Sequence, residues 1–199
     1  MGTLFEDLFS EMREGAQRQN GGSSKAIDVL GLEGIRYSLK TISLDTSLSA
    51  DKIIGCKDIF VPIASLAKDK LVGVENIRDI LIPYYNKISE SIDRQVFLVR
   101  LTSHTSRQKN LSSQFQFIYF EQNFSPLDGE KFEIIHNENA KKCHAFKSDI
   151  NLISIPKKIT WNSASQNLRV YYRIPENADV ITINRSEKFD WKTLVEKIK

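Results

Sequence analysis

The chain has 199 residues, of which 41% are hydrophobic and 27% are charged, with a formal net charge of +3. This composition is typical of a globular protein with its own core and excludes a disordered chain. The longest uncharged apolar stretch, about 59–67, is too short to cross a bilayer. The acidic residues near the N-terminus do not fit a signal peptide. We therefore expect a cytoplasmic protein that does not bind a membrane.

The two cysteines do not indicate a zinc site. Cys56 and Cys143 lie far apart and form no CxxC pair. Reduced thiols are the simpler interpretation. The segment 136–144, HNENAKKCH, has the residue types of a metal site but not the ligand spacing of one.

The first predicted element is a helix from Thr3 to about Gln19. Its apolar residues form one stripe at helical spacing, namely Leu4, Phe5, Leu8, Phe9 and Met12. Thr3 and Glu6 also have the spacing of a capping box, which predicts the start of the helix. The segment NGGSS at 20–24 ends it.

A β-hairpin is predicted next, with strands at 25–31 and 34–43. The loop Leu32-Glu33-Gly34 fits a three-residue turn with Gly34 in the left-handed conformation. Pairing of residue 31 with residue 35 then sets the register of the two strands.

In that register Asp28 lies opposite Ser38. Side chains alternate between the two faces of a strand, so Lys40 shares the face of Ser38. We therefore expect Asp28, Ser38 and Lys40 to cluster on one side of the hairpin.

The remaining elements follow from periodicity and turn residues. A strand and turn are expected at 56–66, and a helix at 74–93 that Pro83 kinks or splits. Strands are expected at 94–102, 114–122, 150–155, 168–174 and 179–183, and a terminal helix from Asp190. This order predicts an α/β or α+β fold with a mixed central sheet. We expect a single domain over 1–199, with a core at 1–125 and a basic C-terminal elaboration at 126–199.

The segment IDVLGLEGIRYSLKT resembles the core of the PD-(D/E)XK nucleases, a superfamily that includes restriction endonucleases. Their pattern is an acid near the end of one strand, a hairpin, and then acid–x–Lys on the next strand. Asp28 matches the first acid, Leu39 the apolar x and Lys40 the lysine. The resemblance implies a restriction-endonuclease-like mixed β-sheet flanked by helices. It covers residues 3–43 well and 56–122 only by the order of elements.

Ser38 departs from the family pattern because it occupies the position of the second acid. The resemblance implies a Mg²⁺ ion held by Asp28, the Leu39 carbonyl and a glutamate from a nearby helix. Glu6 is the first candidate for that glutamate and Glu75 the second. The capping-box interpretation of Glu6 stays open beside this one.

Two basic regions are candidates for contact with DNA. Residues 141–199 hold 12 Lys and Arg against 6 Asp and Glu, a balance that suits a polyanionic partner. The residue types are those that contact phosphates and base edges, and the candidates are His104, Arg107, Lys109, Lys157, Lys158, Arg169 and Arg173. A solvated loop at 102–114 and ordinary strand packing explain the same residues equally well.

These observations together predict a Mg²⁺-dependent DNA endonuclease of the type II restriction class, with Asp28, Ser38, Lys40 and Glu6 at its active site. The family resemblance implies a homodimer on double-stranded DNA. A catalytically inactive DNA-binding module on the same fold is the alternative. A protein-interaction domain with a purely structural hairpin is a third possibility.

Overall fold

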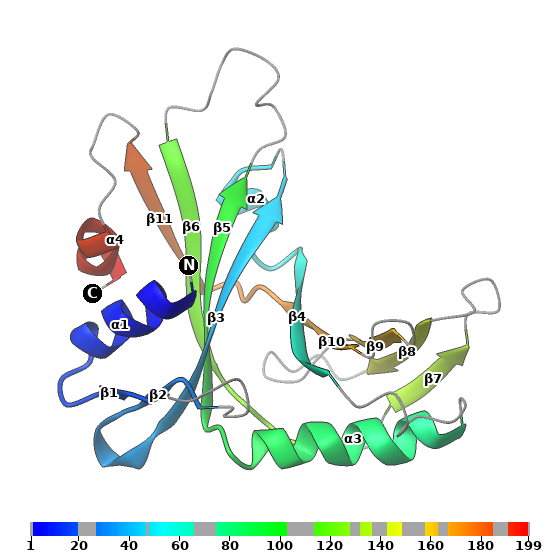
Figure 1. The fold of residues 1–199 in the computed structure, drawn as a ribbon. Helices are drawn as coiled ribbons and strands as arrows, with labels where there is room; N and C mark the ends of the chain where they lie inside the picture. The colour runs from blue at the N-terminus through cyan, green and yellow to red at the C-terminus, as the bar shows by residue number, and fades with distance from the viewer. Residues whose placement is uncertain are drawn as a thin grey trace. The chain divides into compact units, whose positions relative to one another are not determined.

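The computed structural model describes residues 2–19, 27–46, 48–65, 75–102, 114–127, 132–136, 143–148, 158–162, 167–184 and 191–198 (Figure 1). The chain divides into two compact units. Unit 1 comprises residues 1–57, 92–123 and 174–199, and unit 2 comprises 58–91 and 124–173. This division does not follow the expected boundary at residue 125, because 58–91 groups with the later segment.

A mixed sheet forms the centre of unit 1, with six strands among the described residues in the order β1-β2-β3-β5-β6-β11. The strands are β1 (Gln17–Arg18), β2 (Val29–Leu30), β3 (Arg36–Asp45), β5 (Arg94–Thr102), β6 (Gln114–Asn123) and β11 (Asp179–Asn184). Of the strand pairs that the structure describes in this sheet, β3 with β5 is parallel and the others are antiparallel. The broad expectation of an α/β fold with a mixed sheet is confirmed.

The hairpin of β2 and β3 has the predicted register. Val29 pairs with Tyr37 and Leu30 with Arg36, which places residue 28 opposite residue 38. The turn between the strands is a short 3₁₀ segment over Leu32–Gly34. Gly34 has a φ of +78°, in the left-handed region expected for it.

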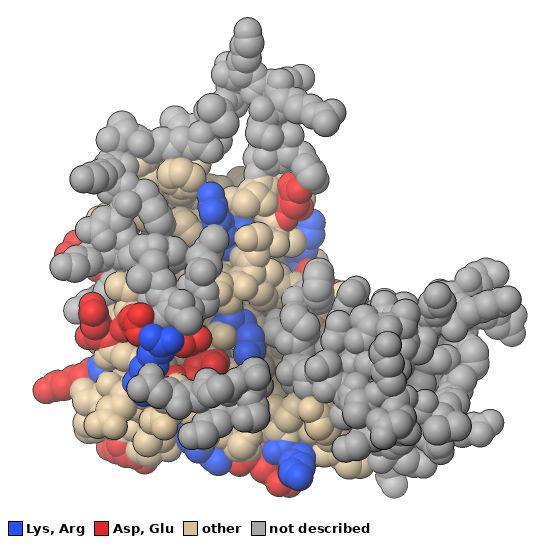
Figure 2. Space-filling model, viewed as in Figure 1, with Lys and Arg blue, Asp and Glu red and all other residues tan. Residues whose placement is uncertain are grey.

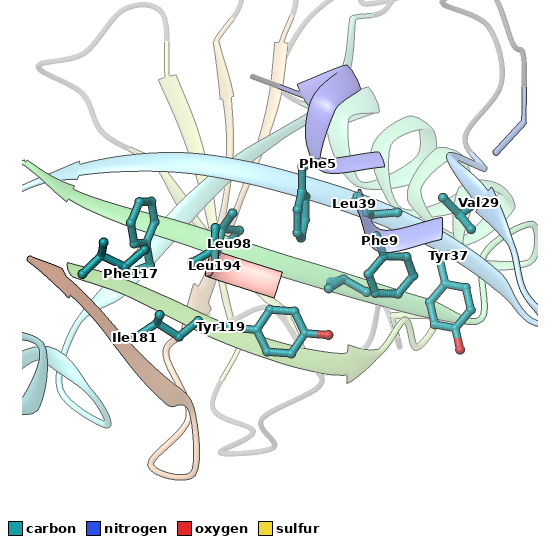
Figure 3. Close-up of a cluster of buried hydrophobic side chains, with 12 residues drawn as sticks. Phe5, Phe9, Val29, Tyr37, Leu39, Leu98, Phe117, Tyr119, Ile181 and Leu194 are labelled. Atoms are coloured by element: carbon teal, nitrogen blue, oxygen red, sulfur yellow. The ribbon is translucent and has the colours of Figure 1, made fainter. Parts of the chain in front are cut away.

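Helices α1 (Gly2–Met12) and α4 (Trp191–Ile198) lie on the same side of this sheet (Figure 1). Phe5 and Phe9 of α1 and Leu194 of α4 join a buried cluster with strand residues Val29, Tyr37, Leu39, Val96, Leu98, Phe117, Tyr119, Ile181 and Ile183. Figure 3 shows Phe117 and Ile181 at one end of this cluster and Val29 and Tyr37 at the other. We call the face of the sheet that carries this cluster the helix-covered face.

Aromatic packing fixes α1 on this face. The rings of Phe9 and Tyr37 meet edge to face with centroids 5.1 Å apart. Arg13 extends the contact, because its guanidinium lies over both rings and also pairs with Glu121 of β6. Burial and the neighbouring Glu121 carboxylate raise the pKa of the Tyr119 hydroxyl, which donates a hydrogen bond to that carboxylate.

The opposite face of the sheet is also buried at its centre. Phe97 of β5 and Phe120 of β6 stack there with ring centroids 4.7 Å apart. Neighbouring residues Val99 and Ile118 are fully buried as well. The middle strands therefore carry apolar side chains on both faces, which explains why β5 and β6 do not alternate apolar and polar residues.

The predicted first helix is too long. The observed helix α1 ends at Met12, and the chain then turns through Gly15, whose φ is +74°, into β1. A glycine in the left-handed region ends helices readily because it has no Cβ to clash. Thr3 lies inside the helix, which begins at Gly2, so the expected capping position is also wrong.

Unit 2 holds an antiparallel sheet in the order β4-β10-β9-β8-β7 and helix α3 (Glu75–Ser89). Its strands are β4 (Asp58–Ser65), β7 (Phe132–His136), β8 (Cys143–Ser148), β9 (Lys158–Asn162) and β10 (Asn167–Arg173). The helix continues through Pro83, so the expectation that this proline splits it is wrong. Pro83 is exposed and its ring is tolerated at the surface of the helix.

Most of the other predicted elements are present at their expected places. They include β4, β5, β6, β10, β11 and α4, whereas β7, β8 and β9 were not predicted. The strand expected at 150–155 lies outside the described residues. Short helix α2 (Ala50–Ile53) completes unit 1. No helix in the described part of the chain is long and apolar enough to span a membrane.

Candidate functional site

The carboxylate of Asp28 is the centre of the cluster that the sequence predicts. Its Oδ2 accepts a hydrogen bond from the Leu39 backbone N–H at 2.7 Å and another from the Ser38 hydroxyl at 3.2 Å. The Lys40 ammonium lies 3.9 Å from the same oxygen. The hairpin register therefore brings Asp28, Ser38 and Lys40 together as expected.

The second carboxylate oxygen of Asp28 differs from the first in its contacts with the described residues. Oδ1 accepts no hydrogen bond from any residue that the structure describes. The Asp28 and Lys40 side chains are 23% and 30% exposed, so both reach solvent. Ser38, by contrast, is 1% exposed. The hydroxyl and the backbone N–H hold one carboxylate oxygen in place, while the other remains available for a ligand.

Strand geometry also places the Leu39 carbonyl at this site. In a strand, the N–H and C=O of one residue point to the same side of the backbone. The Leu39 N–H points toward Asp28, so its carbonyl oxygen lies along the same edge of β3. Its side chain packs on the helix-covered face and is buried.

A row of buried polar residues continues from this cluster across the sheet. Ser38 pairs in register with Gln95 of β5, and Gln95 pairs with Gln122 of β6. Both glutamines are buried, and the Gln122 Nε2 donates to the Gln95 Oε1 at 3.3 Å. The Gln122 Oε1 is buried and accepts no hydrogen bond within the described residues. The row gives a polar strip to a face whose centre is otherwise apolar.

Glu6 does not join the cluster. Its Oε2 accepts a hydrogen bond from Arg18 of β1 at 3.1 Å, and Arg18 also pairs with Asp7 at 2.6 Å. Helix α1 packs on the face of Tyr37 and Leu39, whereas Ser38 and Lys40 point to the other face. The carboxylate is therefore used in an ion pair at the edge of the sheet.

Glu75 is the first residue of α3, and its side chain is outside the described part of the structure. Among the described residues, no group of three or more His, Cys, Asp or Glu side chains is placed to hold a metal ion. Asp28 is the acidic residue that the structure brings to Ser38 and Lys40.

The expected DNA-contacting residues are described only in part. His104, Arg107, Lys109 and Lys157 lie outside the described residues. Lys158 pairs in register with Tyr171, and Arg169 with Thr160. Arg173 pairs with Asp58, its Nε donating at 2.6 Å. On the face shown in Figure 2, basic and acidic side chains are intermixed over the coloured residues.

Sequence reasoning missed Gln95, Gln122 and Arg100 as notable polar residues. They lie in or beside the apolar runs VFLV of β5 and FIYF of β6. A polar residue in or beside such a run is the signal that could have identified them. Their partners depend on the pairing of β3, β5 and β6, which periodicity alone does not give.

Comparisons of the chain with protein-family models, with curated proteins and with solved structures find no match.

Proposed function

We propose that the chain is a Mg²⁺-dependent DNA endonuclease of the restriction type, with Asp28 and Lys40 as its central residues. The observation that carries the proposal is the convergence of the Ser38 hydroxyl, the Leu39 N–H and the Lys40 ammonium on Asp28. A carboxylate can hold a metal ion beside a phosphate, and a carboxylate with a lysine on the next strand is the pair that the resemblance to the PD-(D/E)XK nucleases implies.

The donor set fits a hard cation. Mg²⁺ prefers oxygen ligands and is commonly held by one or two carboxylates together with water and substrate phosphate. The Oδ1 of Asp28, which accepts no hydrogen bond within the described residues, and the Leu39 carbonyl would hold it. When bound, the ion would neutralise charge on the phosphate that is cleaved. Ser38 would orient Asp28 through its hydrogen bond rather than act as a ligand.

Lys40 would position the attacking water and help to remove its proton. Its ammonium lies beside Asp28 and remains partly exposed, so a phosphate group can approach it. Because the register of β2 with β3 is fixed, the distance of Lys40 from Asp28 depends little on loop conformation.

Glu75 is the sequence's second candidate for another carboxylate, and mutation is the test of it. The ion pair of Glu6 with Arg18 disfavours Glu6, the first candidate from the sequence. Glu75→Gln should therefore slow cleavage more than Glu6→Gln does. If Glu6→Gln instead abolishes cleavage as completely as Glu75→Gln does, Glu6 would again be the first candidate.

Strands β10 and β9 of unit 2 are one candidate DNA contact, and the segment at 102–114, of which only the two end residues are described, is a separate one. Val170 and Tyr172 of β10 are buried, so the alternation of a strand assigns positions 169, 171 and 173 to the other face. Lys158 is the register partner of residue 171. Basic residues at these positions would bind the phosphate backbone, as a homodimer on a symmetric site.

The test is incubation of the full chain with plasmid and phage DNA in Mg²⁺ or in EDTA. Wild type should cut the DNA in Mg²⁺ and not in EDTA. Asp28→Asn and Lys40→Ala should each lower the rate at least about a hundredfold, with unchanged circular dichroism. Glu33→Gln, at the exposed tip of the same hairpin, is the matched control and should cut normally. Cleavage unchanged by Asp28→Asn would end the proposal.

A catalytically inactive DNA-binding module is the second candidate, because the described cluster contains one carboxylate and a serine where the family has an acid. It predicts binding without cleavage. Binding should then weaken with salt by about 0.9 log unit per decade for each phosphate contact. Neutralising Lys157, Lys158, Arg169 and Arg173 together should flatten that slope.

A further inference from the structure

A small pocket lies on the helix-covered face of the six-stranded sheet, beyond the apolar cluster. Its volume is about 100 Å³, and it is lined by Thr41, Ile42, Ser43, Leu98, Arg100 and Phe117. Leu98 and Phe117 belong to the buried cluster, so the pocket begins where that cluster ends. Asp28, Ser38 and Lys40 belong to the opposite face, which makes the pocket separate from the candidate active site.

Strand pairing explains how these residues meet. Ser43 of β3 pairs with Arg100 of β5, and Arg100 pairs with Phe117 of β6. Thr41 and Leu98 form the adjacent row. Each of these strands is regular here, so alternation directs Thr41, Ser43, Leu98 and Arg100 to one face.

The guanidinium of Arg100 has unused hydrogen-bonding capacity. Within the described residues it forms no hydrogen bond and no ion pair, and its Nε is buried. Its one contact of note is with Phe115, whose ring centroid lies 5.7 Å from the guanidinium carbon. A cation–π contact is an interaction with the face of the ring and does not satisfy the N–H donors. Arg100 as a whole is half-buried, but its buried Nε has no partner within the described residues, and a polar ligand in the pocket would satisfy it.

The pocket offers donors rather than acceptors at its polar side. The planar guanidinium matches an anion with two oxygens, and the hydroxyls of Thr41 and Ser43 are further donors. Its volume is well below the roughly 300–1,000 Å³ of pockets for drug-sized ligands. A compact anion with several oxygens fits these limits. Asp45, two positions beyond Ser43 on the same face, keeps the site at the strand end from being strongly cationic.

We propose that Arg100, Thr41 and Ser43 form a binding site for a phosphate group. A tetrahedral phosphate can direct separate oxygens at the guanidinium and at each of the two hydroxyls, whereas a carboxylate has only two oxygens in one plane. The group could be free phosphate or the terminal phosphate of a nucleic acid. This site does not depend on the proposed nuclease activity.

The experiment uses the full chain in EDTA, so that cleavage plays no part. Inorganic phosphate is titrated at constant ionic strength, with chloride as the balancing salt. Wild type should show a rise in thermal midpoint and NMR shifts at the amides of Thr41, Ser43 and Arg100. Arg100→Met keeps the aliphatic stem and should weaken binding about ten- to a hundredfold. Arg100→Lys keeps the charge but not the planar fork, and its phosphate affinity should lie between those of wild type and Arg100→Met.

Arg94→Met is the matched control, because Arg94 is on the same strand and pairs with Glu121 at 3.7 Å instead of lining the pocket. It should bind phosphate as wild type does. Short oligonucleotides with a 5′-phosphate or a 5′-hydroxyl distinguish the source of the group. The site is supported if the chain binds inorganic phosphate, or if it binds the 5′-phosphorylated strand and not the 5′-hydroxyl strand. No specific response to any phosphate, an equal response to acetate, or equal loss in Arg94→Met would overturn the proposal.

Discussion

On one face of the six-stranded sheet, β3 contributes Tyr37 and Leu39 to a packed cluster beneath α1 and α4. On the other face, the alternate residues Ser38 and Lys40 surround the carboxylate of Asp28. The same four residues of one strand thus serve a core and a polar site. Packing on the core side fixes the register of β3 with its neighbours. The same register sets the positions of Ser38 and Lys40 on the polar side, so these do not have to be held by a separate network.

This comparison predicts that stability and activity respond to different faces. Phe9→Ala should lower the free energy of unfolding by about 3–5 kcal/mol, because Phe9 is fully buried against Tyr37. Lys40→Ala should change it by less than about 1 kcal/mol, since the ammonium is partly exposed and 3.9 Å from its partner. Urea denaturation of both variants measures the difference.

If Lys40→Ala destabilises the chain as much as Phe9→Ala, the polar face has a structural role and the division between the faces is wrong. The proposed catalytic role of Lys40 would then need a second variant. Lys40→Met keeps the aliphatic stem and removes only the charge, so it separates packing from electrostatics.

Ser38→Glu sharpens the comparison on the polar face itself. Ser38 is buried 3.2 Å from Asp28, so a second carboxylate there repels the first when no cation is present. In EDTA the variant should lose about 1–3 kcal/mol of stability, and Mg²⁺ should restore much of it because binding to the folded state stabilises that state. Thermal melts in EDTA and in Mg²⁺ measure both effects.

Ser38→Ala is the control for this experiment. It removes the hydrogen bond to Asp28 without adding charge, so its loss of stability should be similar in EDTA and in Mg²⁺. A Ser38→Glu variant that is equally unstable in both conditions would show that no cation reaches Asp28.

The hairpin was predictable because local rules determine it. The turn residues Leu32-Glu33-Gly34 set the loop length, and loop length sets the register that joins Asp28 to Ser38. The end of α1 was missed because residues 13–19 are mostly of types that favour a helix, whereas the left-handed conformation of Gly15 turns the chain out of it. The partner of Glu6 could not be found from sequence, since Arg18 reaches it only after the chain reverses into β1.

Non-local pairing explains the other differences. The row from Ser38 to Gln122 and the pocket at Arg100 both require β3, β5 and β6 to be neighbours. Paired residues of β3 and β5, such as Tyr37 and Arg94, lie 57 positions apart in the chain. Side-chain periodicity carries no information on which strands pair. Chain order also suggested one boundary at 125, whereas 58–91 groups with 124–173 because β4 pairs with β10.

The smallest predicted effect concerns the end of the strand pair β3 and β5. The Arg36 guanidinium hydrogen-bonds Asp93 and holds the pKa of that carboxyl at about 2. A lowered pKa contributes stability that is present above the unfolded value near 3.8 and is lost as the pH falls through about 2.

Asp93→Asn should therefore lower the thermal midpoint at pH 7 and leave it nearly unchanged at pH 2. The loss should be a few degrees at most, because the Asp93 side chain is 42% exposed and solvent screens the pair. Added salt should reduce it further. Asp51→Asn, at an exposed position in α2, controls for the general effect of removing a charge. An effect of Asp93→Asn that is as large at pH 2 as at pH 7 would mean that this ion pair does not stabilise the joined ends of β3 and β5.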